Sequence, residues 1–369
     1  MTEGKANEST VHVSTASRDY DVHVGRGLLD GIGGLVREAA GGTRCCVVSD
    51  SNVAPLYAER ALSSLAANGY ETSLHVFEAG EASKRLETYG TCLEALAAAG
   101  LTRDDCVVAL GGGVVGDLAG FAGATYMRGC HVAQVPTSLL AMVDSSVGGK
   151  TAVDLSAGKN LVGAFFQPDV VVADVDCLST ISHDLLTDSC GEVIKHGVLA
   201  DPELFARIEE APINGPGFDR DELARIVARN VEIKRDVVDA DEQERGLRQT
   251  LNLGHTIGHA IEAASGFSLG HGSCVAAGLC CISRAASAMG LMDSADARRI
   301  ERCVAAYGLP TDIGIDHATL VEVARRDKKR HADSVNVILP RRIGEVEVRR
   351  VTMDEFARIV DLGCGTGRA

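Results

Sequence analysis

The sequence predicts two domains, an α/β domain with a parallel sheet followed by a mostly α-helical domain. Three observations lead to this prediction. The chain has 369 residues, which is long for a single hydrophobic core. Up to about residue 180, short β-rich runs alternate with Ala-rich helical runs, as in repeated βαβ units. Beyond that point strand signals nearly vanish and long helical patterns follow.

In the first half, each short apolar run rich in β-branched residues predicts a strand. Helices are expected between the strands, for example at Val53–Asn68 and Leu86–Ala99. The predicted strands are Val11–Val13, Tyr20–Val24, Arg44–Val48, Glu71–Phe77, Cys106–Leu110, His131–Val135 and Val170–Ala173.

The second half predicts a boundary near residue 180, with domains at 1–180 and 181–362. One late strand is expected at Ser334–Leu339, and residues 363–369 are expected to form a loose tail. The helices predicted in this half are Asp188–Leu199, Asp221–Asp239, Leu247–Ala264, Ser273–Met289 and Ala295–Tyr307.

Charge and composition limit the possible partners. A net charge of −15 argues against a nucleic-acid or anionic-membrane surface, both of which need a basic face. No signal peptide is apparent, and no apolar run approaches the ~20 residues of a membrane span. The 12 cysteines are scattered without a CxxC pair, so we expect free thiols and a cytoplasmic protein.

A glycine-rich turn, Gly111–Asp117, follows the predicted strand Cys106–Leu110 and precedes the helix-compatible run Leu118–Tyr126. Backbone amides at such a helix N-terminus bind a diphosphate, and glycine lets phosphate oxygens approach the backbone. The turn is not the ordinary dinucleotide-binding fingerprint, because it is not near the N-terminus and the next strand leads into Pro136 rather than an acidic residue. A tight turn without a ligand is therefore the alternative interpretation.

A polar stripe follows one face of the predicted helix Leu247–Ala264. At about 100° per residue, Arg248, Asn252, His255 and His259 fall within roughly 60° of one another. Burying these groups without partners is costly, and a solvated face is usually rich in Lys and Glu instead. We therefore interpret the stripe as functional rather than as a solvated helix surface.

The spacing of His255 and His259 allows both imidazoles to bind one metal ion, although the sequence has no HExxH motif. His271 and Glu192 are further candidate ligands, because one carboxylate and two histidines suit Zn²⁺ with open positions for substrate oxygens. Lysines in apolar contexts indicate a pocket for a phosphate and a carboxylate. These lysines are Lys150, Lys159, Lys195, Lys234, Lys328 and Lys329.

Five longer segments resemble the 3-dehydroquinate synthase family. The resemblance extends from about Tyr20 to Pro340. It implies an NAD-binding α/β domain with a parallel sheet, a mostly α-helical metal-binding domain, and an active site between them. The segments are Gly111–Gly129, Val135–Asp154, Gly158–Pro168, Glu192–Gly197 and Leu247–Glu262.

The resemblance also implies a carbon–oxygen lyase of the shikimate pathway, which leads to aromatic amino acids. That family converts 3-deoxy-D-arabino-heptulosonate 7-phosphate to 3-dehydroquinate and phosphate. The implied steps are a transient oxidation by NAD, elimination of phosphate, reduction and an intramolecular aldol closure. NAD and Zn²⁺ or Co²⁺ are the implied cofactors, and the implied partners are a phosphorylated sugar acid and a second copy of the chain.

Carried over position by position, the resemblance implies Glu192, His255 and His271 as metal ligands and His259 as a proton acceptor. Arg128 is implied to reach the phosphate site of the partner in a homodimer. The implied NAD contacts are Asp50, Asn52, Glu81, Lys84, Gly112, Gly113, Val114, Asp117, Thr137, Ser138, Lys150, Lys159 and Thr180. The implied substrate contacts are Asp144, Lys150, Asn160, Lys195, Lys234, Arg248, Asn252, His259 and one of Lys328 or Lys329.

The chain departs from the family pattern at residues 181–185, at Gly191, at His196 and at Ser273. Serine at 273 replaces a glutamate, so we expect the loss of a carboxylate that supports the metal ligand His271.

Rival interpretations are other sugar phosphate cyclases, such as aminodehydroquinate or 2-deoxy-scyllo-inosose synthases, and metal-dependent alcohol or glycerol dehydrogenases. A non-catalytic NAD-binding relative is a third. The retained substrate-binding cations favour dehydroquinate synthase, and the intact metal set argues against a non-catalytic protein.

Overall fold

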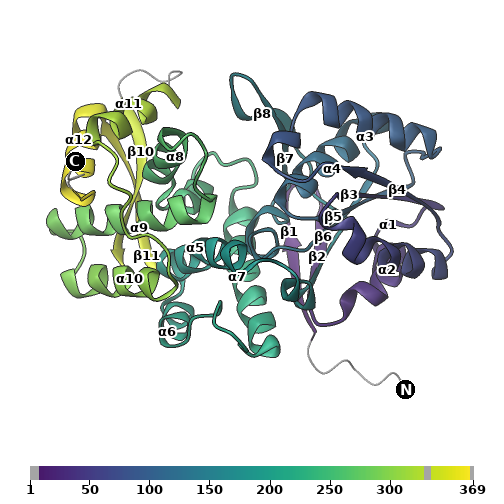
Figure 1. Ribbon diagram of the computed structural model, residues 1–369, viewed down its shortest axis with the longest axis horizontal. Helices are drawn as coiled ribbons and strands as arrows, with labels where there is room; N and C mark the ends of the chain where they lie inside the picture. The colour runs from purple at the N-terminus through teal and green to yellow at the C-terminus, as the bar shows by residue number, and fades with distance from the viewer. Residues whose placement is uncertain (1–7, 328–333, 366–369) are drawn as a thin grey trace. The chain divides into compact units, whose positions relative to one another are not determined.

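The computed structural model describes residues 8–327 and 334–365, and the chain divides into two compact units (Figure 1). Unit 1 comprises Met1–Ile181 and Asp219–Gln243, and unit 2 comprises Ser182–Phe218 and Glu244–Ala369. The chain first leaves unit 1 next to the boundary expected near residue 180, and then returns to it for one long helix, α7 (Arg220–Ala240). This helix packs against β1 and β2 and therefore belongs to unit 1.

Unit 1 is built on a seven-stranded sheet of order β1-β2-β9-β6-β5-β3-β4, which confirms all seven predicted strands. Every neighbouring pair is parallel except β1 and β2, which pair antiparallel at one edge. The strands are β1 (Ser9–Ser14), β2 (Asp19–Gly25), β3 (Arg44–Asp50), β4 (Glu71–Phe77), β5 (Cys106–Gly111), β6 (His131–Pro136) and β9 (Val170–Asp174).

Helices cover both faces of this sheet (Figure 1). The chain passes from β3 to β4 on one side of β3 and then crosses back to β5 on the other side. Because such crossovers are right-handed, the reversal places α2 and α3 on opposite faces. The helical segments of this part are η1 (Leu28–Gly31), α1 (Ile32–Ala40), α2 (Ala54–Ala67), η2 (Glu81–Ser83), α3 (Leu86–Ala98), α4 (Gly113–Thr125), η3 (Tyr126–Arg128), η4 (Ala141–Ser145) and η5 (Val175–Ser179).

A hairpin outside the main sheet was not predicted. It consists of β7 (Lys150–Leu155) and β8 (Gly158–Phe165), paired antiparallel, and it contacts α4. Much of β8 is exposed and its sequence contains two glycines, so it lacks the apolar β-branched run by which the sheet strands are recognised.

Unit 2 is mostly helical, as predicted. Its central helix is α9 (His271–Ala288), which is largely buried and contacts α5, α8, α10 and α12. The expectation of one late strand is wrong, because β10 (Ser334–Arg342) pairs with β11 (Glu345–Thr352), whose charged and exposed sequence concealed it. The other segments are α5 (His183–Ala200), α6 (Pro202–Glu210), η6 (Leu247–Asn252), α8 (His255–Ala264), α10 (Ser294–Ala306), α11 (His317–Asp327) and α12 (Met353–Gly363).

The start of the segment expected to be a loose tail is held by packing and hydrogen bonds. Gly363 ends α12, Cys364 is buried, and the amide of Gly365 donates to Asp312. All 12 cysteines fall within the described residues, and each is a buried free thiol. Among the described residues, no helix is both long and apolar enough to cross a bilayer.

A buried carboxylate joins three segments at the amino-terminal edge of the unit 1 sheet. Asp105, only 1% exposed, accepts hydrogen bonds from the amides of Thr43 (2.9 Å), Arg44 (2.8 Å) and Thr102 (2.8 Å). Burial by itself raises the pKa of Asp105, but these amides hold it down at about 2, below the ordinary 3.8. The ionised carboxylate therefore fixes β3 and β5 together at their starts.

We expect Asp105→Asn to lower the free energy of unfolding by about 1–3 kcal/mol at neutral pH, because the amide loses charge and one acceptor oxygen. The folded pKa is depressed, so the stabilisation is complete above about pH 4 and is lost as the pH falls towards 2. Denaturant unfolding of both proteins across this range measures the difference. The exposed neighbour Asp104→Asn is the control, and an equal effect there would contradict the prediction.

Candidate functional site

In unit 1, the residues predicted to bind NAD gather at the carboxyl edge of the sheet. Parallel strands end at one edge, so the segments that follow them meet there, and ligands bind where the strand order reverses. Here the order reverses between β3 and β5. Asp50 ends β3, Gly112 directly follows β5, and Thr137 directly follows β6. Lys150 and Lys159 lie instead in the hairpin. The other predicted NAD contacts lie further along the segments that follow β3, β4, β5, β6 and β9; they are Asn52, Glu81, Lys84, Gly113, Val114, Asp117, Ser138 and Thr180.

The glycine turn leads directly into α4, which begins at Gly113. The first-turn amides of a helix have no partner within the helix and attract phosphate oxygens. A Cβ placed on Gly112 would lie 3.5 Å from Ser138 Oγ, an ordinary van der Waals contact, so packing within the chain does not by itself require glycine there. The turn therefore fits the diphosphate of a dinucleotide.

A buried lysine links the glycine-turn helix to the hairpin. The Lys84 ammonium donates to Asp117 Oδ2 (2.5 Å) in α4 and to Asn160 Oδ1 (2.5 Å) in β8. Burial raises the pKa of Asp117, and the charge of Lys84 offsets part of that rise. At the rim, Lys159 pairs with Glu81 at 3.3 Å. Lys84 thus joins Asp117, a predicted NAD contact, to Asn160, a predicted substrate contact.

Four predicted substrate contacts lie in unit 1. Asn160 has a positive φ of 56° and its amide donates to Asp154 (2.7 Å), while Lys150 is exposed at the start of β7. Lys234 of α7 donates to the carboxylate of Asp144 (2.6 Å) and contacts its carbonyl. Lys234, which is predicted to bind substrate, therefore has the carboxylate of Asp144 as its counterion within the same unit.

In unit 2, the prediction of a single helix over Leu247–Ala264 is wrong. The chain forms η6, breaks at Leu253 and Gly254, and restarts as α8 at His255. Gly254 has a φ of 78°, and a Cβ there would lie 2.9 Å from the carbonyl oxygen of Val275 in α9. Close packing against α9 thus imposes a left-handed glycine, and the polar stripe is divided between two helical segments.

The predicted metal ligands come together around Glu192 of α5. Its Oε1 lies 3.4 Å from His255 Nε2 and 3.2 Å from His271 Nε2. Ligands bound about 2.0–2.1 Å from a tetrahedral Zn²⁺ are separated by roughly 3.3 Å, so these spacings fit a shared ion. Glu192 is fully buried, and among the described residues neither of its oxygens finds a hydrogen bond of good geometry. A buried carboxylate of this kind is suited to bind a divalent cation.

The other nitrogens of the two histidines are held by acceptors. His255 Nδ1 donates to the Leu253 carbonyl (3.1 Å), and His271 Nδ1 donates to Glu262 Oε2 (3.3 Å). Donation through Nδ1 leaves Nε2 of each ring for a metal ion, which is the usual arrangement in metal sites.

Charges shift the acid–base behaviour of this cluster. Burial by itself raises the pKa of Glu192, but Lys195 and His255 hold it well below its usual range. Burial alone would lower the pKa of His271, but Glu192 and Glu262 raise it to about 10, so a cation binding at Nε2 must displace a proton.

His259 lies beside the predicted ligands, and its ring nitrogen is within 4.8 Å of those of His255 and His271. The residue is exposed, yet its pKa is lowered to about 3, first through desolvation and then through the neighbouring imidazoles. His259 is therefore neutral at physiological pH. The three histidines alone form an alternative metal set.

The remaining predicted substrate contacts of unit 2 lie near the proposed metal ligands in the sequence, but their side chains have different contacts. The Lys195 ammonium contacts Glu192 Oε2, and both side chains are almost completely buried. Arg248 is 1% exposed, and Asn252 donates to Glu244 (2.9 Å). Lys328 and Lys329 lie outside the described residues.

Two supporting carboxylates, Glu262 and Asp188, were not predicted. Glu262 lies seven residues after His255, which places both on one face of α8, and Asp188 lies four residues before Glu192 on α5. The same helical periodicity that revealed the stripe would have identified both.

Arg128 lies at the opposite edge of the sheet from the NAD candidates, because α4 runs back from the end of β5 to the start of β6. Met127 and Arg128 both have positive φ, 52° and 67°. Arg103 donates to the Met127 carbonyl (3.0 Å) and holds this strained turn.

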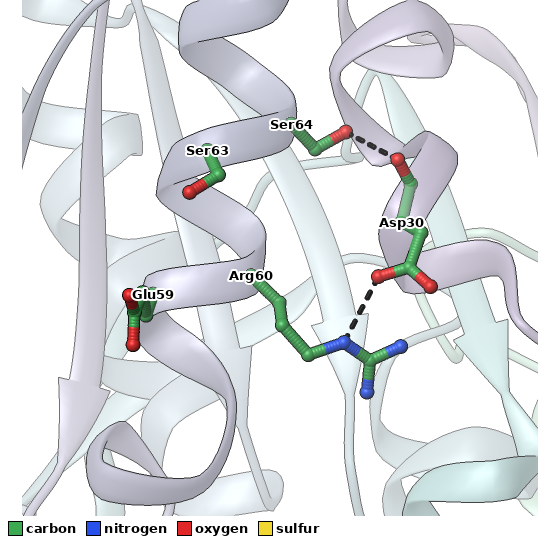
Figure 2. A pocket seen from close by; sticks show the side chains of 5 residues that line it. All are labelled: Asp30, Glu59, Arg60, Ser63 and Ser64. Carbon is green, nitrogen blue, oxygen red and sulfur yellow. Dashed lines mark hydrogen bonds and ion pairs between the residues drawn. The ribbon is translucent and has the colours of Figure 1, made fainter.

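A separate surface pocket of about 420 Å³ lies in unit 1, between α2 and η1 (Figure 2). Arg60 donates to the Asp30 carboxylate (2.9 Å) and Ser64 donates to the Asp30 carbonyl (2.8 Å). Glu59 and Ser63 complete its lining. Its lining contains none of the predicted site residues, and its contacts serve the packing of α2 on η1.

Comparison with known proteins identifies similar sequences and structures. The 3-dehydroquinate synthase N-terminal family matches residues 74–188, and the 3-dehydroquinate synthase C-terminal family matches residues 189–330. A 3-dehydroquinate synthase of Symbiobacterium thermophilum is 46% identical over 89% of this chain and 93% of its own. One from Xanthomonas axonopodis pv. citri is 45% identical over 90% of this chain and 92% of its own.

Solved structures show the same fold. A 2-deoxy-scyllo-inosose synthase complexed with carbaglucose-6-phosphate, NAD⁺ and Co²⁺ matches with a TM-score of 0.86 at 26% identity, over 96% of this chain and 100% of that one. A 2-epi-5-epi-valiolone synthase from Streptomyces hygroscopicus with NAD⁺ and Zn²⁺ bound matches with a TM-score of 0.84 at 27% identity, over 95% of this chain and 98% of that one.

The two possible metal sets predict different metal contents. If Glu192, His255 and His271 are the ligands, Glu192→Gln and His271→Ala should bind Zn²⁺ at least about tenfold more weakly, whereas His259→Ala should bind it as the wild type does. Equilibrium titration with Zn²⁺, followed by metal analysis of the dialysed proteins, measures this. Loss of metal in His259→Ala with retention in Glu192→Gln would instead establish the three-histidine set.

Proposed function

The chain belongs to the 3-dehydroquinate synthase family, and on this premise we propose which of its residues carry out the family's reaction. That reaction converts 3-deoxy-D-arabino-heptulosonate 7-phosphate to 3-dehydroquinate and phosphate, with NAD and a divalent metal as cofactors. The observation that best supports the site assignment is the buried carboxylate Glu192, whose Oε1 faces Nε2 of both His255 and His271.

Glu192, His255 and His271 would hold Zn²⁺ or Co²⁺, which supplies a Lewis acid for the oxygens of the substrate. Lys195 balances the charge of Glu192 and is a candidate contact for an anionic group of the substrate. His259 lies beside these ligands and would accept the proton of a substrate hydroxyl, directly or through water.

Arg248 and Asn252 would hold polar groups of the substrate. Arg248 is 1% exposed, and its planar guanidinium is suited to bind a phosphate or carboxylate through two parallel hydrogen bonds.

The carboxyl edge of the unit 1 sheet would bind NAD, which when bound would supply reversible hydride transfer. The amides at the start of α4 would bind the diphosphate, and Asp50, Glu81 and Lys159 would line the rest of the cofactor site. The substrate would be oriented by Lys150, Asn160, Lys234 and Asp144, so that one molecule is retained through every step.

The free, buried thiols support a reducing, cytoplasmic location.

We further propose that the active protein is a homodimer in which Arg128 serves the partner's site. Arg128 lies at the amino edge of its own sheet, away from the cofactor residues at the carboxyl edge. The strained turn Met127–Arg128 is held by Arg103, which suits a side chain presented outward for binding.

The rival function is that of another sugar phosphate cyclase, since the structural match to 2-deoxy-scyllo-inosose synthase is close. That match is at 26% identity, whereas the match to a 3-dehydroquinate synthase reaches 46%. Substrate identity therefore discriminates between the two.

With the heptulosonate 7-phosphate, Zn²⁺ and a trace of NAD⁺, we expect the wild type to release one phosphate per substrate over many turnovers per NAD⁺. NADH should not accumulate, because the cofactor is regenerated. A malachite-green phosphate assay with absorbance at 340 nm measures both. His259→Ala should lower kcat by about 10²–10⁴. The proposal would be refuted if glucose 6-phosphate, and not the heptulosonate 7-phosphate, released phosphate. It would also be refuted if NADH formed in proportion to product.

Subunit mixing tests the role of Arg128. Arg128→Ala and His259→Ala should each be nearly inactive, whereas a refolded equal mixture should regain about a quarter of wild-type activity, because each heterodimer contains one intact site. The control for the turn is a mixture of Arg103→Lys and His259→Ala, in which Arg128 itself is unchanged. A mixture that stays inactive although heterodimers form would show that Arg128 does not act across subunits.

A further inference from the structure

The first turn of α9 is fastened to α5 by one carboxylate. Asp188 Oδ1 accepts from the Ser273 amide (2.8 Å) and from Ser273 Oγ (2.7 Å), and Asp188 Oδ2 accepts from the Gly272 amide (3.1 Å). These three hydrogen bonds all go to one side chain on the neighbouring helix. The predicted metal ligand His271 is the first residue of the helix held in this way.

The backbones of the two helices touch at the same place. A Cβ on Gly272 would lie 1.8 Å from the Asp188 carbonyl oxygen, and a Cβ on Gly191 would lie 2.2 Å from the Gly272 carbonyl oxygen. No side chain larger than hydrogen fits at either position. The start of α9 is therefore placed by contact as well as by hydrogen bonds, and Asp188 fixes its direction.

Asp188 and Glu192 lie four residues apart on α5, so both project from one face of that helix. Glu192 faces the ring of His271, at 3.2 Å from Nε2. Asp188 holds the backbone amides of the two residues that follow His271. One helix thus supplies a proposed ligand of the metal and the group that aims the neighbouring ligand at it.

Ser273 takes part in the same arrangement. Its hydroxyl donates to Asp188, whereas a glutamate at this position would place a second carboxylate beside the first. The start of α9 therefore still has a carboxylate beside it, although residue 273 is a serine, because Asp188 of α5 supplies one.

We propose that Asp188 is a positioning residue for the metal ligand His271, acting through the first turn of α9. The inference rests on the metal site proposed above. It predicts that removal of Asp188 weakens metal binding although Asp188 itself is not a ligand. Metal affinity of this kind depends on the partners that orient the ligands.

An ordinary helix cap would stabilise α9 without affecting a metal. Asp293 provides the matched case in the same unit, because its carboxylate caps α10 by accepting from the Ala295 amide (2.7 Å). Loss of either cap is expected to lower the melting temperature. Only the loss of the Asp188 carboxylate should also weaken metal binding.

The experiment titrates metal-free, full-length proteins with Co²⁺ and follows the visible absorption of the bound ion. We expect Asp188→Ala to bind roughly 10- to 100-fold more weakly than the wild type and to show an altered Co²⁺ spectrum. Asp188→Asn, which keeps one acceptor for Ser273, should restore much of the affinity. Ser273→Ala, which removes only the hydroxyl bond, should cost less than Asp188→Ala. Asp293→Ala should match the wild type in affinity and spectrum.

Each result separates the two proposals. If the wild type binds no Co²⁺ or Zn²⁺, the metal site itself is wrong. If the wild type binds and Asp188→Ala matches it, or if Asp293→Ala loses as much affinity, the positioning role is wrong. Should Asp188→Ala fail to fold, Asp188→Asn and Ser273→Ala decide the question by the same comparison.

Discussion

A carboxylate with no exposed surface, Glu192, sets the constraint around which the metal-binding part of unit 2 is organised. A buried negative charge is tolerated only with compensating charge and hydrogen bonds. Lys195 contacts one oxygen, and the imidazoles of His255 and His271 face the other. A divalent cation held by Glu192 and the two rings, as proposed above, would complete this compensation and would account for the polarity placed among apolar helices.

The same constraint explains the packing of the helices that hold the ligands. The three proposed ligands lie on α5, α8 and α9, so these helices must approach closely enough for their side chains to share one ion. Glycines allow that approach: Gly254 and Gly258 lie against α9, and Gly191 lies against Gly272. Larger residues at these contacts would separate the helices, and the ligand atoms with them.

Much of this was predictable, for a physical reason. The strands of the unit 1 sheet are buried and apolar, so their sequence signal is strong, and the carboxyl-edge rule then brings Asp50, Gly112 and Thr137 to one place. The hairpin β7–β8 and strand β11 were missed because exposed strands carry no such signal. The break at Gly254 was missed because it is imposed by α9, a contact distant in sequence, whereas local periodicity favoured one continuous helix.

The two histidines of α8 show where sequence spacing stops being informative. At positions i and i+4, His255 and His259 are equivalent as candidate ligands. In the folded chain His255 is buried, its Nδ1 is fixed by the Leu253 carbonyl and its Nε2 faces Glu192. His259 is exposed, and its ring lies edge-on to that of His255 with 5.2 Å between the ring centroids. The carbonyl that distinguishes them is available only because the chain breaks at Leu253 and Gly254, since in a continuous helix that carbonyl would accept from the amide four residues on. The break that divides the stripe is therefore what gives its two histidines different chemical environments.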